Sequence, residues 1–152
     1  MKQEAMEVLK NRRSIRSYKN EQVSQTDLDA VLELGTYAPT SKGIQCPVIV
    51  AVQDADTVAQ LVKMNAEIMG VNTNPYSGAR TIVLVFAPKA NPTCVEDGRA
   101  VMTQLLLAAY AVGLGSCWIN RERQMFESKE GKELMKKWGL SEDYIGIGGL
   151  SL

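Results

Sequence analysis

Histidine is absent from the sequence, and this absence excludes several kinds of chemistry. Without an imidazole there is no Ser-His or Cys-His catalytic pair, no histidine general base and no histidine metal ligand. The three cysteines, Cys46, Cys94 and Cys117, lie far apart and form no CxxC pair, so the sequence predicts neither a zinc site nor a disulfide framework. They are typical of thiols in a reducing compartment, and we expect a cytoplasmic protein with no bound metal. Any chemistry must therefore come from other side chains or from a bound cofactor.

An excess of charge of one sign is also lacking, because 17 basic side chains are balanced by 17 acidic ones. Nucleic-acid-binding domains usually carry a basic excess, so we do not expect such a partner. No apolar run approaches the length of a membrane span, and the N-terminal ten residues mix acidic and basic side chains, unlike a secretory signal. Neither GxGxxG nor GxxxxGK[ST] occurs, which excludes the two common glycine-rich phosphate loops.

The pattern of apolar residues predicts a single domain over residues 1–152, in which helices surround one sheet. Ser24 and Asp27 have the spacing of a helix-capping pair, and Gly70, Gly113 and Gly139 are expected to end helices. Residues 101–112 are apolar on most sides, which predicts a core helix. The expected helices are 4–11, 24–36, 54–70, 91–115 and 123–139, and the expected strands are 48–52, 81–87, 116–119 and 144–152.

One short segment, "NRRSIRSYKN" at residues 11–20, concentrates positive charge in this otherwise neutral chain. If it is extended, Arg12, Ser14 and Arg16 face the same side, and two guanidinium groups with a hydroxyl suit a phosphate. The alternative is a solvated surface with Arg–Asp pairs, which is the more common situation for an isolated charge run.

Two further segments offer groups that can contact a ligand. "APTSKGIQCP" supplies hydroxyl, amide and ammonium donors, and Gly43 allows close backbone approach; taken alone, it is an ordinary polar loop. "GLGSCWIN" places two glycines between a helix and a short strand, where they either end the helix or admit a flat ligand. Trp118 and Trp138 are expected in the core, and Cys46 is expected to be an inert thiol.

Taken together and in this order, these segments resemble the FMN-dependent nitroreductase family over nearly the whole chain. "RRSIRSY" resembles the family's RRSxRxF/Y phosphate segment, and "APTSKGIQCP" resembles its APSxxNxQPW loop. "NPYSGARTIVLV" resembles the segment PFxGAPxxIV. "EDGRAVMTQLLLAAYAVGLGSCWI" resembles the long central helix (D/E)xGxAxQNLLLAAxxLGLGxCWI, and "FESKEGKELMKKWGLSEDY" resembles the helix and turn before the last strand.

The resemblance implies an α+β fold with a central, mainly antiparallel sheet flanked by helices, in a homodimer with FMN at the interface. It implies ping-pong hydride transfer from NADH or NADPH through flavin N5 to nitroaromatic or quinone-like acceptors, with no obligatory catalytic side chain. Arg16 is implied as the cation that stabilises the flavin N1–O2 edge, and the loop contacts are implied to come from the second subunit. The implied cofactor contacts are Arg12, Arg13, Ser14, Arg16, Pro39, Thr40, Ser41, Gly43, Gln45, Asn65, Gly115, Ser116, Cys117 and Trp118.

The sequence departs from the family pattern at several positions. Gly43 replaces the loop asparagine, Cys46-Pro47 replaces Pro-Trp, and Arg80 replaces the proline of GAP. The family usually continues past the last strand with a basic phosphate ligand and an arm, and we expect these to be absent because the chain ends at Leu152. A non-catalytic flavin-binding protein, or another flavin chemistry on the same fold such as dehalogenation or flavin fragmentation, stays open.

Overall fold

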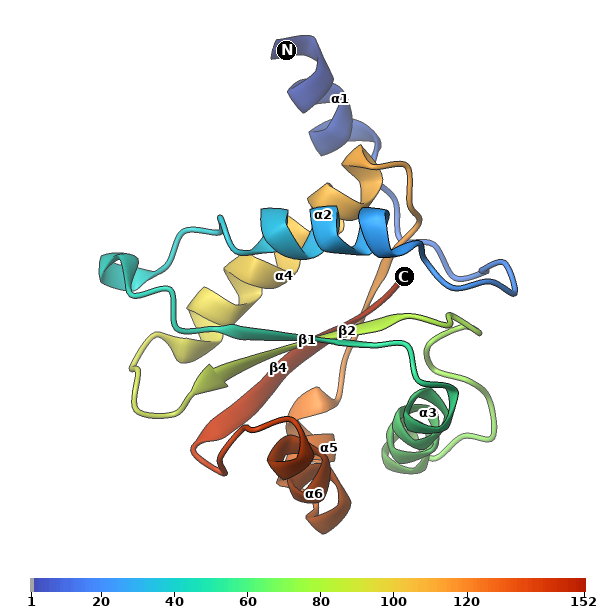
Figure 1. Ribbon diagram of the computed structural model, residues 1–152, viewed down its shortest axis with the longest axis vertical. Coiled ribbons are helices and arrows are strands. Elements are labelled where there is room, and N and C mark those ends of the chain that lie inside the picture. The colour runs from blue at the N-terminus through green and yellow to red at the C-terminus, as the bar shows by residue number, and fades with distance from the viewer. Residues whose placement is uncertain (1) are drawn as a thin grey trace.

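The structure, a computed structural model, describes residues 2–152 and consists of a four-stranded sheet between two layers of helices (Figure 1). The strands are β1 (Val48–Val52), β2 (Ile82–Pro88), β3 (Cys117–Ile119) and β4 (Tyr144–Ser151). The helices are α1 (Lys2–Asn11), α2 (Gln25–Gly35), α3 (Ala55–Met69), α4 (Cys94–Ala111), α5 (Glu122–Glu127) and α6 (Lys129–Lys137), with a short 3-10 turn, η1 (Ser41–Gly43).

The sheet has the strand order β1-β2-β4-β3, and each of its neighbouring pairs is antiparallel. The expected α+β fold with an antiparallel central sheet is therefore confirmed. A β-bulge interrupts the pairing of β2 with β4, because Val85 pairs with Gly148 whereas Phe86 pairs with Gly146. Ile147 is the extra residue on β4, and bulges of this kind bend a strand and change where its side chains point.

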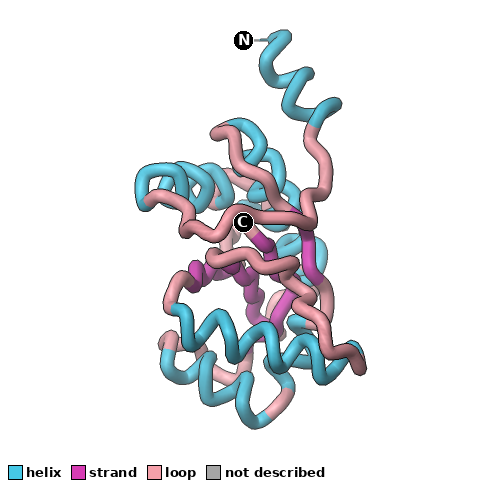
Figure 2. The backbone as a smooth tube through the Cα atoms, turned by 90° about the vertical axis from the view of Figure 1, so that its right-hand side faces the viewer, coloured by secondary structure: helices cyan, strands magenta, loops and turns pink. Residues whose placement is uncertain are grey.

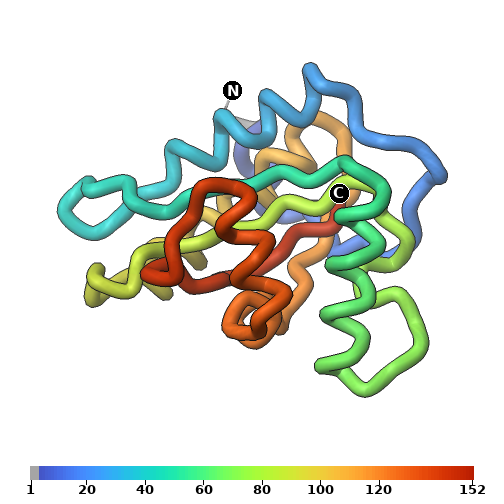
Figure 3. Tube along the Cα trace, turned by 60° about the horizontal axis from the view of Figure 1, so that its bottom comes forward, coloured from blue at the N-terminus to red at the C-terminus, as the bar shows by residue number. Residues whose placement is uncertain are grey.

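Strand β2 separates two hydrophobic cores because its side chains alternate between the faces of the sheet. Ile82, Leu84 and Phe86 pack in the core that α3, α5 and α6 cover. Val83 and Val85 face the opposite core, which α2 and α4 cover. Figures 1 and 3 show these two helical layers, with α3 in green beside α5 and α6 in orange to red. Every residue from Thr81 to Ala87 is buried, as the apolar run predicts.

Most expected helix and strand boundaries agree with the structure to within a few residues. The Ser24 hydroxyl accepts a hydrogen bond from the Asp27 N–H at 3.1 Å, which confirms the predicted cap of α2. Gly113 follows α4 with a φ of 85°, in the left-handed conformation that commonly follows a helix.

The single helix expected over residues 123–139 is wrong, because the chain forms α5 and α6 with a break at Ser128. Ser128 has an extended ψ of 160°, and its hydroxyl accepts the Gly131 N–H at 3.1 Å, so it caps α6. Gly131 then packs against the backbone of α5, where an added Cβ would lie 2.1 Å from the Met125 carbonyl oxygen. The apolar periodicity continues across the break, and periodicity alone therefore did not predict it.

Helix α4 is a core helix, as its apolar residues predict, and one stripe of it is exposed. Val101, Met102, Leu105 and Leu106 are buried against the sheet and α2, whereas Tyr110 on the outward stripe is 38% exposed. Helix α1 projects from the rest of the chain, as Figure 2 shows. In the part of the chain that the structure describes, no helix has both the length and the apolar character needed to cross a membrane.

Candidate functional site

The basic segment lies beside the turn that follows α4. The Ile15 N–H donates to the Ser116 carbonyl at 2.9 Å, and Ser14 forms an isolated parallel bridge with Ser116. Gly115 permits this approach, because an added Cβ would lie 3.1 Å from the Ile15 side chain. The structure therefore brings together two of the three segments that the sequence singled out. Because the bridge is parallel, the chain runs from Arg12 to Arg16 in the same direction as it runs from the turn into β3.

Arg12 provides the clearest indication of a ligand. Its Nη1 is buried and has no hydrogen-bond partner among the described residues. A buried guanidinium nitrogen without a partner is costly, and it is a donor prepared for an acceptor that the protein itself does not supply. A surface hollow of about 570 Å³ adjoins it, lined among others by Tyr110, Gly113 and Gly115. A phosphate, which accepts bidentate charge-assisted hydrogen bonds, fits this donor.

The other side chains of the basic segment differ in whether they already have hydrogen-bond partners. The Arg13 guanidinium donates to the carbonyls of Lys10 at 2.7 Å and Arg12 at 2.9 Å, so it satisfies backbone groups at the end of α1. Ser14 and Arg16 are exposed, and neither side chain has a hydrogen-bond partner in the described part of the chain. Arg12, Ser14 and Arg16 are therefore available to a ligand, whereas Arg13 already has intramolecular partners.

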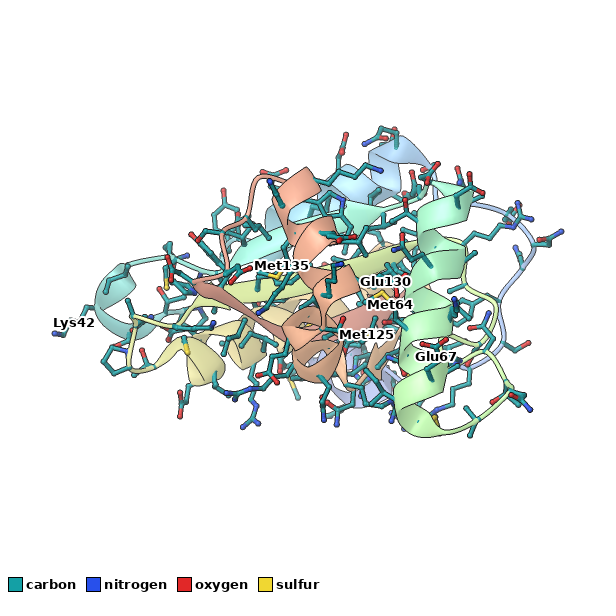
Figure 4. The ribbon with its side chains drawn as sticks, turned by 90° about the horizontal axis from the view of Figure 1, so that it is seen from below. Lys42, Met64, Glu67, Met125, Glu130 and Met135 are labelled. Carbon is teal, nitrogen blue, oxygen red and sulfur yellow. The ribbon has the colours of Figure 1, made fainter. Side chains whose placement is uncertain are left out.

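The expected ligand-contacting loop over residues 39–45 is held rigid by its own hydrogen bonds. The Gln45 N–H donates to the Thr40 hydroxyl at 2.9 Å, and the Thr40 hydroxyl in turn donates to the Gln45 side-chain oxygen. The Gln45 amide nitrogen donates to the Thr36 carbonyl at 2.8 Å. Gly43 has a φ of 64°, a left-handed conformation that glycine adopts without steric cost. Lys42 points into solvent at the tip of the loop, as Figure 4 shows.

Asp97 anchors this loop to α4, which sequence reasoning did not predict. Its carboxylate accepts the Ser41 N–H at 2.9 Å and the Asn91 side-chain amide at 2.9 Å, and it also accepts the Thr93 hydroxyl. Burial alone would raise the pKa of Asp97, but these hydrogen bonds outweigh it and lower that pKa. The loop is thereby fixed near the first turn of the helix.

The loop and the Arg12 hollow lie at opposite ends of α4. Asp97 is near its start, and Tyr110, which lines the hollow, is near its end. At 1.5 Å per residue the two points are about 20 Å apart along the helix. Within one chain, the structure thus does not bring residues 39–45 to the residues of the basic segment.

Three further expected contacts, Asn65, Ser116 and Cys117, are buried within this chain. Asn65 has no exposed surface, and its amide nitrogen donates to the Asn120 carbonyl at 2.9 Å. Its side-chain oxygen accepts the Arg121 Nε–H at 2.7 Å. The Cys117 side chain is 2% exposed and faces the core of α3, α5 and α6. Asn65 therefore belongs to a polar cluster inside the protein, between α3 and the turn that follows β3.

That cluster contains a second buried polar atom without a partner. Glu122, only 1% exposed, accepts the Tyr76 hydroxyl at 2.9 Å on Oε1, while its Oε2 has no hydrogen-bond partner among the described residues. Sequence reasoning missed this carboxyl; the adjacent Arg121 and Glu122, just after the predicted short strand over residues 116–119, were the pattern that could have indicated it. No group of three or more Cys, Asp or Glu side chains in the described part of the chain is arranged to hold a metal ion.

Comparison with known proteins places this geometry among the nitroreductases. The chain is 29% identical to a protein of Archaeoglobus fulgidus that is provisionally named as an NADH dehydrogenase/NAD(P)H nitroreductase, over 99% of this chain and 84% of that protein. It superposes on an FMN-dependent nitroreductase of Clostridium difficile with a TM-score of 0.79 and 26% identity, over 96% of this chain and 84% of the other.

The fold is also that of a nitroreductase of Bacteroides fragilis solved with bound FMN. The TM-score is 0.88 at 24% identity, over 97% of this chain and 86% of the other. The family resemblance that the sequence motifs indicated is confirmed. Residues 9–84, half of the chain, match the model of the nitroreductase family, and the chain belongs to that family.

Proposed function

We propose that the protein binds FMN and transfers hydride from NADH or NADPH to electron-poor acceptors such as nitroaromatics or quinones. The observation that carries this proposal is the buried Nη1 of Arg12, which has no partner in the described part of the chain and lies beside the hollow of about 570 Å³. It is supported by the FMN in the Bacteroides fragilis relative and by the name of the Archaeoglobus fulgidus relative. FMN, when bound, would supply the hydride-accepting chemistry, so the absence of histidine is no obstacle.

The residues of the basic segment have distinct roles in this proposal. Arg12 and Ser14 would hold the phosphate end of the cofactor, because Arg12 offers a donor that has no partner among the described residues. Arg16, exposed and unpaired among the described residues, places its positive charge at the flavin N1–O2 edge. A fixed cation at that edge stabilises the negative charge that reduction leaves on the ring. Arg13 supports the segment through α1 and needs no direct contact with the cofactor.

A homodimer would complete the site. The loop that is expected to contact the flavin lies about 20 Å along α4 from the Arg12 hollow of the same chain. A second copy would bring its own Thr40–Gln45 loop to that hollow. Helix α1 supports this arrangement, because Met6 and Leu9 are 49% and 66% exposed on a helix of ten residues. So short a helix is only marginally stable in water without a packing partner.

The proposal is tested on the purified protein, and the test does not depend on which acceptor the protein uses in the cell. We expect the protein to be yellow, to release FMN on denaturation, and to lose its flavin absorbance when NADH or NADPH is added anaerobically. A nitroaromatic or a quinone should then restore the oxidised spectrum, without NAD(P)H and acceptor needing to bind together. A bound flavin that neither nicotinamide bleaches would identify a non-catalytic flavin-binding protein, and a colourless protein that does not bind added FMN would contradict the proposal.

A further inference from the structure

A buried polar cluster holds the turn between β3 and α5. Glu122 accepts the Tyr76 hydroxyl at 2.9 Å, and Asn65 donates to the carbonyl of Asn120 at 2.9 Å. Arg121 donates from Nε to Asn65 at 2.7 Å. The two turn residues are thus attached to α3, and the first residue of α5 is attached to the loop before β2. In Figure 4 the neighbouring Met64 and Met125 mark this core between α3 and α5.

The turn has a backbone conformation that needs such support. Arg121 has a φ of 86°, in the left-handed region that is unfavourable for a side chain of this kind. Conformations of this type persist where the surrounding structure over-determines them, and they concentrate at functional sites. The hydrogen bonds of Asn65 with the Asn120 carbonyl and the Arg121 guanidinium hold Arg121 in this conformation.

Strand β4 leaves room for the Glu122 carboxyl. An added Cβ at Gly149 would lie 2.3 Å from Glu122 Oε1, and one at Gly146 would lie 2.6 Å from the Glu122 carbonyl oxygen. Glycine weakens a strand interior, and its presence often marks a close approach of another group. Strand β4 is thus shaped around a carboxyl whose Oε2 is buried and has no hydrogen-bond partner in the described part of the chain. A core selected only for stability would not favour this arrangement.

The carboxyl binds a proton near neutral pH. Burial raises the pKa of Glu122 to about 7, against the opposing effects of the Tyr76 hydrogen bond and the positive charge of Arg121. Among the described residues, Tyr76 from the loop before β2 and Arg121 from the turn itself are the ionisable groups that act on it. Burial also raises the pKa of Tyr76 well above its ordinary value, so Tyr76 stays a neutral hydroxyl donor.

The turn lies toward the ring end of the proposed cofactor site. The basic segment and the residues around Ser116 run parallel, so the direction from Arg12 to Arg16 is the direction from Ser116 along β3. In the proposed function, Arg12 meets the phosphate and Arg16 meets the ring. The chain reaches Asn120 only one residue after β3 ends at Ile119, so the turn follows the ring end of the site directly.

We propose that Glu122 is a positioning residue whose neutral carboxyl, bonded to Tyr76, anchors the first residue of α5 and so supports the Asn120–Arg121 turn at the ring end of the cofactor site, and whose ionisation loosens this turn and weakens FMN binding. This inference rests on the proposed function for the identity of the ligand. The effect of Glu122 ionisation on the turn does not depend on that ligand. A carboxylate in this position has one oxygen without any donor, and opening the turn would let water reach it. Alkaline pH would therefore lower the fraction of the protein that is competent to bind.

The experiment compares the full-length wild-type protein with Glu122→Gln, which keeps the shape and the Oε1 acceptor but cannot ionise. FMN affinity is measured by flavin fluorescence at constant ionic strength. If only the protonated form binds, the wild-type dissociation constant should rise by up to roughly 20-fold between about pH 6.5 and pH 8.5. In Glu122→Gln it should change only as the phosphate of FMN itself titrates. Hydrogen exchange of the amides at residues 120–124 is followed on the FMN-free protein over the same range.

Faster exchange of these amides in the wild type at alkaline pH, relative to Glu122→Gln at the same pH, would support the inference. Parallel pH profiles of the two proteins, in affinity and exchange alike, would overturn it. If Glu122→Gln does not fold, Tyr76→Phe replaces it: loss of the hydroxyl donor should move the transition of the turn to higher pH, and an unmoved transition would overturn the inference. A wild-type protein that binds no FMN at any pH contradicts the proposed function, while the exchange data still decide whether Glu122 fixes the turn.

Discussion

The backbone N–H of Ile15 donates to the carbonyl of Ser116 at 2.9 Å, across 101 positions of sequence. This bond joins the basic segment to the turn after α4 and fixes Arg12 above the end of that helix. It also sets the parallel direction that relates Arg16 to β3. The candidate site therefore depends on a backbone contact between two segments, each of which is ordinary when considered alone.

Replacement of Arg12 by alanine should weaken FMN binding strongly. The change removes a donor whose hydrogen bonds to a charged acceptor are worth roughly 1.5–3 kcal/mol each, or about 10- to 100-fold in affinity. Ser14→Ala should have a smaller effect in the same direction. Lys19→Ala is the matched control, because Lys19 carries the same charge in the same segment but pairs with Glu21 at 3.6 Å. Equal FMN dissociation constants for Arg12→Ala and Lys19→Ala would remove Arg12 from the phosphate site.

Replacement of Asp97 by alanine should release the loop over residues 40–45. The Ser41 N–H and the Asn91 amide lose their acceptor, and we expect a loss of about 1–3 kcal/mol in the free energy of unfolding, measured with urea. Because hydrogen bonds lower the pKa of Asp97, its contribution is present above its ordinary value of 3.8 and is lost as the pH falls through its folded value. Asp97→Asn should therefore show less acid destabilisation than the wild type between about pH 5 and pH 2. Identical acid profiles would argue against this anchor.

Glu122 should make the stability of the FMN-free protein depend on pH in the sense opposite to Asp97. Its folded pKa of about 7 lies above the ordinary value of 4.5. Its contribution to the free energy of unfolding is therefore complete below pH 4.5 and is lost as the pH rises through about 7. Relative to Glu122→Gln, the wild type should lose stability of order 3 kcal/mol over this interval and change little above it. Urea unfolding of both proteins at several pH values measures the difference. A constant difference across the range would show that the carboxyl does not take up a proton on folding.

Gly149→Ala should destabilise the protein because its Cβ would meet the Glu122 carboxyl at 2.3 Å. Overpacking of this kind typically costs about 1–3 kcal/mol. Glu122→Ala removes the obstructing group, so the double variant should be more stable than the sum of the two single changes predicts. A double-mutant cycle by urea unfolding measures this coupling, and strict additivity would show that Gly149 is not required by Glu122.

Leu9→Glu should dissociate the proposed dimer and reduce FMN retention together. Leu9 is 66% exposed within the chain, and in the dimer a carboxylate would be buried without a partner. Ile68→Glu is the control, because Ile68 is 42% exposed on α3, in the layer opposite to α2 and α4. Sedimentation and flavin content are measured on the same samples. A Leu9→Glu protein that remains dimeric with native flavin content would place the interface elsewhere.

Some residues that the sequence singled out already have partners within their own chain. Leu106 lies in the helix over residues 101–112 that was predicted for the core, and it is 8% exposed and packs within its own chain. A charge there would disrupt the monomer and would not test the dimer specifically. Arg13 and Gln45 were expected as cofactor contacts, yet both already bond to nearby backbone carbonyls. Residue type and spacing reveal which groups are capable of binding, but not whether the protein itself already occupies them.

The sequence by itself determined the family, the alternation of helices and strands, and the basic segment, because these depend on local periodicity and on motifs that are contiguous in the chain. Only the tertiary structure decided which donors remain unpaired. Among the residues that the structure describes, Arg12 Nη1 and Glu122 Oε2 have no hydrogen-bond partner because of packing between segments distant in sequence, and Asp97 accepts the Ser41 N–H across 56 positions. Whether a buried polar group has a hydrogen-bond partner depends on the whole fold. The candidate site lies where one such group, the Arg12 guanidinium, has a donor without a partner among the described residues.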